Sequence, residues 1–155
     1  MGAVWTSVVA VAGTLLGSVV THTFQRLAAR RGELFARAEA LRQERIATYS
    51  GFAAAVEDYR HGQADRWYRR AEDPDGAAYV AARDEAHRLR TMCRQALYRV
   101  RLLTDDQEVV RAAELAYHRT REVSYAGEQA ERDARDAAAR EAIEAFVARA
   151  APLVR

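Results

Sequence analysis

The sequence contains no lysine, so its 24 strongly basic residues are all arginine. Schiff-base formation and general-base catalysis by lysine need an ε-amine, and those reaction classes are therefore excluded. A single cysteine, Cys93, excludes an internal disulfide and is typical of a reducing compartment. The formal net charge is only +2, so the chain as a whole has no strong field that would attract nucleic acid or membranes.

Proline occurs only twice, at Pro74 and Pro152, and β-branched residues are sparse after the first 20 positions. Alanine and arginine are abundant, and both are good helix formers. No stretch alternates apolar and polar residues as a half-buried strand does. We therefore expect an all-α fold, a helical bundle in which short connections make neighbouring helices antiparallel.

Charge is absent from the first 25 residues, and three arginines follow closely, Arg26, Arg30 and Arg31. A helix over residues 3–24 would be about 33 Å long, enough to cross the hydrocarbon core of roughly 30 Å. Trp5 suits one membrane interface, and the arginines suit a cytoplasmic flank. These features predict a single transmembrane helix over residues 1–25 in the cell membrane, with the N-terminus outside and residues 26–155 as a cytoplasmic helical bundle domain.

Three other interpretations compete for this segment, because several threonines and serines lower its hydropathy. A cleaved signal peptide would carry basic residues before its apolar stretch, and none are present. A buried helix of a soluble assembly would also suit a run that only just reaches the length of a span. An interfacial helix would carry basic residues along a polar face, which this segment does not. The transmembrane helix is the preferred interpretation.

Within the uncharged segment, Gly13 and Gly17 form a GxxxG pattern. Small residues at this spacing allow two helices to approach closely in lipid. The pattern therefore predicts self-association and a homo-oligomer. The alternative is a chance occurrence, since such a short motif is common in segments rich in glycine and alanine.

Apolar residues at helical spacing predict a long first helix that ends at about Gly62. This helix either continues directly from the membrane helix or restarts near Gly32. We expect Trp67 and Tyr68 on a short further helical piece. The residues that share the apolar face of the long helix are Leu34, Ala38, Leu41, Arg45, Thr48, Phe52, Val56 and Tyr59.

Three more helices are predicted after a break at residues 71–76, where Pro74 and Gly76 interrupt the pattern. The second helix covers residues 77–103. Thr104 resembles an N-cap with Gln107 three residues later, so a third helix should run from there to about Tyr125. Its predicted inner face is formed by Val109, Ala113, Ala116, Thr120 and Val123. The fourth should cover residues 128–150 and end before Pro152. Its first half holds little except alanine and charge, so the core is thin and would benefit from a partner or a second copy.

No constellation typical of an enzyme is visible. The nearest approaches to a di-iron pattern are Asp84 with His87 and Glu114 with His118, and neither pair repeats the other. Surface positions are the better interpretation for all four residues. No zinc spacing and no glycine-rich phosphate loop occurs. We therefore expect a protein without catalytic residues, metal or cofactor.

The most distinctive surface feature is a basic stripe on the second predicted helix. Its members fall within about 60° of one another at 100° per residue, and they are Arg83, His87, Arg90, Arg94 and Arg101. A second basic cluster (Arg60, His61, Arg66, Arg69 and Arg70) surrounds Trp67 and Tyr68. Arginines among aromatic residues can bind phosphates of nucleic acid or of anionic lipid. The alternative, which we prefer, is that the stripe pairs with acidic residues of the fourth helix between positions 128 and 144.

Three segments resemble a set of small actinobacterial membrane-anchored helical proteins, some labelled KilB-like: VVAVAGTLLGSVVTHTFQRLAARR, RQERIATYSGFAAAVEDYR and LYRVRLLTDD. The label comes from a protein tied to the intercellular spread of conjugative plasmids. The resemblance implies an accessory or scaffold role in the transfer of mobile elements at the membrane, and it brings no catalytic residue. A different class of function, binding of nucleic acid or anionic lipid by the stripe, stays open beside it.

Overall fold

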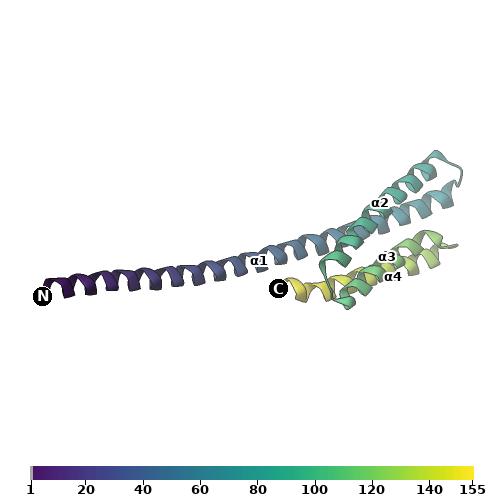
Figure 1. The fold of residues 1–155 in the computed structure, drawn as a ribbon. Coiled ribbons are helices and arrows are strands. Elements are labelled where there is room, and N and C mark those ends of the chain that lie inside the picture. The colour runs from purple at the N-terminus through teal and green to yellow at the C-terminus, as the bar shows by residue number, and fades with distance from the viewer. Residues whose placement is uncertain (1) are drawn as a thin grey trace. The chain divides into compact units, whose positions relative to one another are not determined.

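The computed structural model describes the backbone of residues 2–155 and the side chains of residues 32–155. The described residues form four α-helices and two short 3-10 helices, with no strand among them (Figure 1). In chain order the elements are α1 (Gly2–Glu72), α2 (Ala77–Leu103), α3 (Gln107–Glu122), η1 (Val123–Tyr125), α4 (Gln129–Ala150) and η2 (Ala151–Val154). The all-α prediction is confirmed, and the predicted bounds of the second helix are those of α2.

The chain divides into two compact units, Met1–Leu41 and Arg42–Arg155. The second unit contains the C-terminal part of α1 together with α2, α3 and α4, and these helices pack as a bundle. In the first unit, Leu34 and Phe35 have 66% and 75% of their surfaces exposed. The predicted apolar face of the long helix is therefore buried only in part: Phe52, Val56 and Tyr59 lie in the core, whereas Leu34 and Leu41 are exposed.

The core of the second unit joins α1 to α3 and α4. The Phe52 and Phe146 rings meet edge to face with centroids 4.8 Å apart, a favourable geometry for aromatic pairs. On α3, the predicted inner face is confirmed, since its members are all buried: Val109, Ala113, Ala116, Thr120 and, just beyond the helix, Val123. Small alanines on α3 and α4 let these two helices approach closely, and large side chains from α1 fill the remaining space.

The first helix does not end near Gly62, as the spacing predicts, but continues to Glu72. Gly62 lies against α2: a Cβ atom there would be 2.5 Å from Leu89 Cδ1. The glycine therefore allows close contact between two helices, and the cost of placing it in a helix interior is roughly 1 kcal/mol. As a consequence, Trp67 and Tyr68 belong to α1 itself and not to a separate piece.

The junction between α2 and α3 corrects a second prediction. Thr104 is the C-cap of α2, and the N-cap of α3 is Asp106. The Asp106 carboxylate accepts hydrogen bonds from the backbone N–H groups of Glu108 and Val109, while Thr104 Oγ1 accepts one from Asp106 N–H. Both residue types satisfy helix N–H groups well, and spacing alone did not distinguish between them.

The last helix begins one residue later than predicted, at Gln129, with Glu128 as its N-cap. It ends at Ala150 as expected, but the chain then continues through Pro152 as the 3-10 helix η2. Proline is compatible with the first turn of a helix because its missing N–H has no partner there. The third helix is also shorter than predicted, because residues Val123–Tyr125 form η1.

The predicted transmembrane segment, residues 1–25, lies outside the residues whose side chains the structure describes. The same holds for the predicted association residues Gly13 and Gly17 and for the predicted membrane flank, Trp5, Arg26, Arg30 and Arg31. Among the residues whose side chains the structure describes, no helix has a stretch both long enough and apolar enough to cross a membrane.

Candidate binding surfaces

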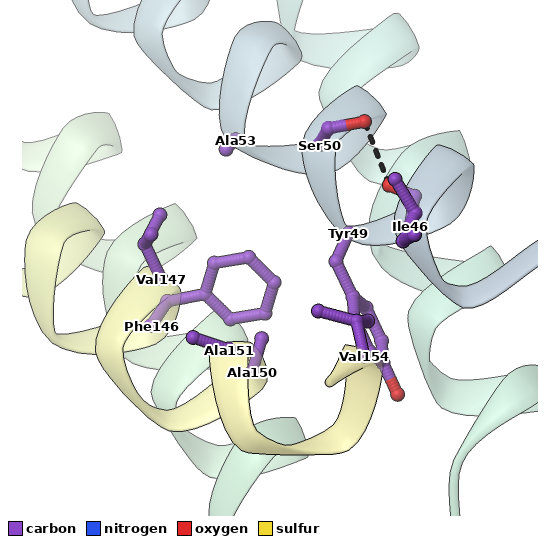
Figure 2. A pocket seen from close by; sticks show the side chains of 9 residues that line it. All are labelled: Ile46, Tyr49, Ser50, Ala53, Phe146, Val147, Ala150, Ala151 and Val154. Atoms are coloured by element: carbon purple, nitrogen blue, oxygen red, sulfur yellow. Dashed lines mark hydrogen bonds between the residues drawn. The ribbon is translucent and has the colours of Figure 1, made fainter. Parts of the chain in front are cut away.

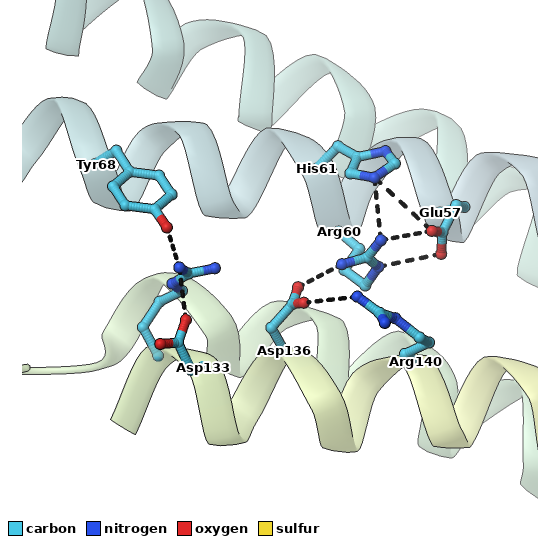
Figure 3. A network of polar contacts seen from close by, with 8 residues as sticks. Glu57, Arg60, His61, Tyr68, Asp133, Asp136 and Arg140 are labelled. Atoms are coloured by element: carbon cyan, nitrogen blue, oxygen red, sulfur yellow. Dashed lines mark hydrogen bonds and ion pairs between the residues drawn. The ribbon is translucent and has the colours of Figure 1, made fainter. Parts of the chain in front are cut away.

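A buried ionic network connects α1 to α4 (Figure 3). Arg60 is only 5% exposed, and its Nη1 donates to Asp136 Oδ1 at 2.5 Å. Arg60 also donates twice to the Glu57 carboxylate, through Nε and Nη2. Hydrogen bonding from Arg60 lowers the pKa of Glu57 below its ordinary value, against the opposing effect of burial. The network thus holds Arg60 charged between two carboxylates.

A second contact between the same helices is made by Arg132 of α4. Its guanidinium lies 4.5 Å from the centroid of the Tyr68 ring and 5.8 Å from that of Trp67, and it donates to the Tyr68 hydroxyl. Trp67 Nε1 and Arg70 Nη2 both donate to the carbonyl oxygen of Ala126, at 2.8 and 2.9 Å. Two members of the second basic cluster, Arg60 and Arg70, are therefore structural, because they connect α1 to α4 and to the α3–α4 connection.

The basic stripe of α2 does not pair with α4, so our preferred interpretation of it was wrong. Arg83 contacts the neighbouring Asp84, and Arg101 donates to Glu114 of α3 at 3.0 Å through Nε. Arg90 Nε donates to the Tyr117 hydroxyl, also on α3, at 3.2 Å. The physical reason is the packing order: α2 lies beside α3, and acidic residues of α4 bind Arg60, Arg132 and Arg135 instead.

The two remaining members of the stripe face solvent. The side chains of His87 and Arg94 are exposed, and neither makes a hydrogen bond or ion pair with the residues that the structure describes. Residues 86–104 contain no acidic residue, so nothing on this part of α2 neutralises them. An exposed arginine without an acidic partner, on the same face as a histidine, is suited to contribute to the binding of an anionic polymer or surface.

Arginines from three helices, Arg66 of α1, Arg90 of α2 and Arg121 of α3, act electrostatically on Tyr125 of η1. Arg121 Nε of α3 donates to the Tyr125 hydroxyl at 3.4 Å, and the Arg121 guanidinium lies 6.0 Å from the centre of that ring. The hydrogen bond from Arg121 lowers the pKa of Tyr125, and the charges of Arg90 and Arg66 act in the same direction. Sequence reasoning had separated these residues: Arg66 was assigned to the Trp67 cluster, and Arg121 and Tyr125 were not singled out.

An apolar groove with a volume of about 330 Å³ lies between α1 and the C-terminal end of α4 with η2 (Figure 2). Its lining side chains are almost all apolar or aromatic: Ile46, Tyr49, Ser50, Ala53, Phe146, Val147, Ala150, Ala151 and Val154. The Tyr49 hydroxyl is buried and has no hydrogen-bond partner among the described residues. Ser50 Oγ bonds to the backbone oxygen of Ile46, so the groove presents little polar chemistry.

The residues weighed as metal ligands are used in other ways. Asp84 accepts hydrogen bonds from Arg83, and Glu114 accepts them from Arg101, while His87 and His118 lie on the surface. Across residues 32–155, no group of three or more histidine, cysteine or acidic side chains is placed to share a metal ion. Cys93 is fully buried, and burial raises the pKa of its thiol to about 12.

These features define a class of protein, a bundle of α-helices with a basic outer face and an apolar groove. A comparison with family models then identifies the family: residues 46–154 match the KilB plasmid transfer protein model, and the chain belongs to this family. The match begins and ends within the second unit and so covers the bundle. Neither the curated proteins nor the solved structures gave a match. The resemblance to KilB-like proteins is thus confirmed.

Proposed function

We propose that this chain is a non-enzymatic accessory protein of plasmid transfer, whose bundle acts as a self-associating scaffold on the cytoplasmic side of the cell membrane. The observation that carries this proposal is the family match, because it spans the whole bundle. The chemistry of the bundle supports it as well. Its buried polar groups, Arg60 with Asp136 and Arg132 with Tyr68, connect helices to one another and leave few polar atoms facing the apolar groove.

Attachment to the membrane is the second part of the proposal. The sequence supports it through an uncharged run of 25 residues followed by Arg26, Arg30 and Arg31. Self-association is supported by Gly13 and Gly17 in that run. Leu34 and Phe35 of the first unit add to this, because such exposed apolar side chains are normally covered by a partner.

The membrane assignment is tested by expressing the full-length chain in cells and extracting the membranes with carbonate. We expect the protein to stay in the pellet after high-speed centrifugation. A protein found in the supernatant would contradict the assignment. Deleting the coding sequence from a transferable plasmid should reduce the frequency of transfer, and unchanged transfer would contradict the accessory role.

Self-association is tested by crosslinking Gly13→Leu and Gly17→Leu variants in membranes. A leucine at either position would keep two helices apart, so we expect fewer crosslinked oligomers. Val11→Leu is the control, because position 11 lies on the opposite side of a helix from both glycines. Equal crosslinking of all variants would exclude this face from the oligomer.

A second function, binding of nucleic acid or anionic lipid, is favoured by one specific observation. The basic stripe, made of Arg83, His87, Arg90, Arg94 and Arg101, has no acidic partner on α4, and its members His87 and Arg94 face solvent. Phosphate contacts of this kind are strongest at low salt. Binding of DNA or of anionic vesicles should therefore be detectable at low ionic strength, and absence of both at low salt would exclude this function.

A further inference from the structure

We propose that Arg66, Arg90 and Arg121 form a binding site for a phosphate of single-stranded DNA, next to the ring of Tyr125, on which a base stacks. This proposal deepens the second function above and rests on it. The second function requires only a continuous charged face, whereas this proposal names a defined site with arginines from α1, α2 and α3.

Two of the three arginines, Arg90 and Arg121, are held in place by contacts within the bundle. Each is partly buried, and Arg90 is fixed by its hydrogen bond to Tyr117, whose ring stacks on that of the buried Tyr59 with centroids 6.0 Å apart. On the α1 side, Gln63 Nε2 donates to the backbone oxygen of Arg121 at 3.0 Å. Guanidinium groups already ordered in this way lose less conformational entropy when they bind an anion.

Arg90 and Arg121 have no acidic partner. Arg90 donates to the Tyr117 hydroxyl and Arg121 to the Tyr125 hydroxyl, and in the described part of the chain neither forms an ion pair with a carboxylate. Elsewhere in the bundle, Arg60 and Arg101 have carboxylate partners within hydrogen-bond distance. Cations held near one another without an acid are stabilised when an anion such as phosphate binds between them.

Two observations favour a nucleic acid strand over a lipid headgroup. Tyr125 is 52% exposed, so an unpaired base can reach its ring. Arg94, an exposed member of the stripe one turn from Arg90, extends the basic surface along α2, and several arginines in a row match a chain of phosphates better than a single headgroup.

The test is binding of a fluorescently labelled single-stranded 20-mer by the detergent-solubilised full-length chain, measured by anisotropy over a range of salt concentrations. We expect Arg66→Ala, Arg90→Ala and Arg121→Ala each to weaken binding about tenfold and to lower the salt slope by about 0.7. Arg149→Ala is the matched control: it removes the same charge from an exposed position on α4, and we expect it to bind like the parent chain.

The role of the ring is tested separately. Tyr125→Phe should bind like the parent, whereas Tyr125→Leu should weaken binding about fivefold or more, because stacking needs the aromatic face. Thermal unfolding of every variant identifies any that fail to fold, and Arg121→Gln then replaces Arg121→Ala as a milder change.

Three results would overturn the proposal. One is equal affinity for duplex and single strand together with no effect of Tyr125→Leu. Another is a preference for anionic vesicles over DNA at the same salt concentration. The third is loss of binding in Arg94→Ala while the three site variants bind normally, which would leave the second function intact but move it away from this site. If the parent chain binds neither DNA nor vesicles, both this proposal and the second function are contradicted. The scaffold proposal, which is tested by membrane extraction and transfer frequency, is not affected by that result.

Discussion

Two arginine-rich regions of this bundle behave in opposite ways. Between α1 and α4, the side chains of Arg60 and Arg132 are buried, and each meets a carboxylate or an aromatic ring from the other helix. On the outer face of α2, the side chain of Arg94 is exposed and meets no partner in the described part of the chain. The residue type is the same, so the difference comes from the helix that lies opposite.

This comparison shows why charge patterns alone mislead about function. Both the second basic cluster around Trp67 and the α2 stripe combine arginine with aromatic residues, a pattern suited to bind phosphate. In the cluster, Arg60 is instead part of the structure, because α4 presents Asp136 to it. The stripe stays available, because α3 offers it only one carboxylate, that of Glu114. A surface arginine is therefore informative about binding only once its neighbours are known.

The largest expected difference between the two regions is in their contribution to the stability of the bundle. Arg60→Ala should lower the free energy of unfolding by about 2–4 kcal/mol, since it removes the main partner of the buried Asp136. Arg140 Nη2 remains 3.5 Å from Asp136 Oδ2 and reduces the loss. Arg94→Ala should change stability by less than about 0.5 kcal/mol. Urea unfolding followed by circular dichroism measures both, and similar losses would mean that the two regions do not differ.

A smaller effect tests which sides of α1 are in contact with other helices. Gly51→Ala should stabilise the bundle by up to about 1 kcal/mol, because a Cβ there meets nothing within 4 Å. The gain in stability from Gly62→Ala should be smaller than that from Gly51→Ala by at least about 0.5 kcal/mol, since the new Cβ would displace Leu89 of α2. Thermal unfolding of the two variants compares them directly. An equal gain at both sites would contradict the close contact with α2.

The smallest effect concerns the inner face of α2, where Cys93 lies. Its raised pKa, about 12, means that the folded state disfavours the thiolate. The contribution of this group to stability should be constant below the unfolded thiol pKa of about 8.5 and decline above it. At pH 8, alkylation by iodoacetamide should be far slower in the native chain than in urea. Equal rates would show that the inner face opens freely.

Much of the fold followed from the sequence. The bounds of α2 and the buried face of α3 were predicted correctly, because apolar residues at helical spacing must lie on the inner side of a bundle. The errors occurred at Gly62 and Thr104, where two outcomes had similar local signals. A glycine can end a helix or allow a close contact, and Thr104 and Asp106 can each act as a cap.

The candidate site was predicted only in part. The stripe was recognised from its spacing on one helix, but Arg66, Arg121 and Tyr125 come from other segments, and nothing local links them. A signal existed on α3 and η1, where Tyr117, Arg121 and Tyr125 recur every four residues. This spacing places them on one side of a helix, but it does not say that the α2 stripe lies next to it.

The sequence by itself determined the helical class, the bounds of α2 and the resemblance that the family match confirms, because these depend on local propensity and on patterns along one chain. The tertiary structure alone decided which arginines are buried and which are free. Ion pairs form across tens of residues of sequence, as between Arg60 and Asp136, and their formation depends on which helices are neighbours. That choice is made by the packing of the core, where Phe52 and Phe146 bring α1 and α4 together.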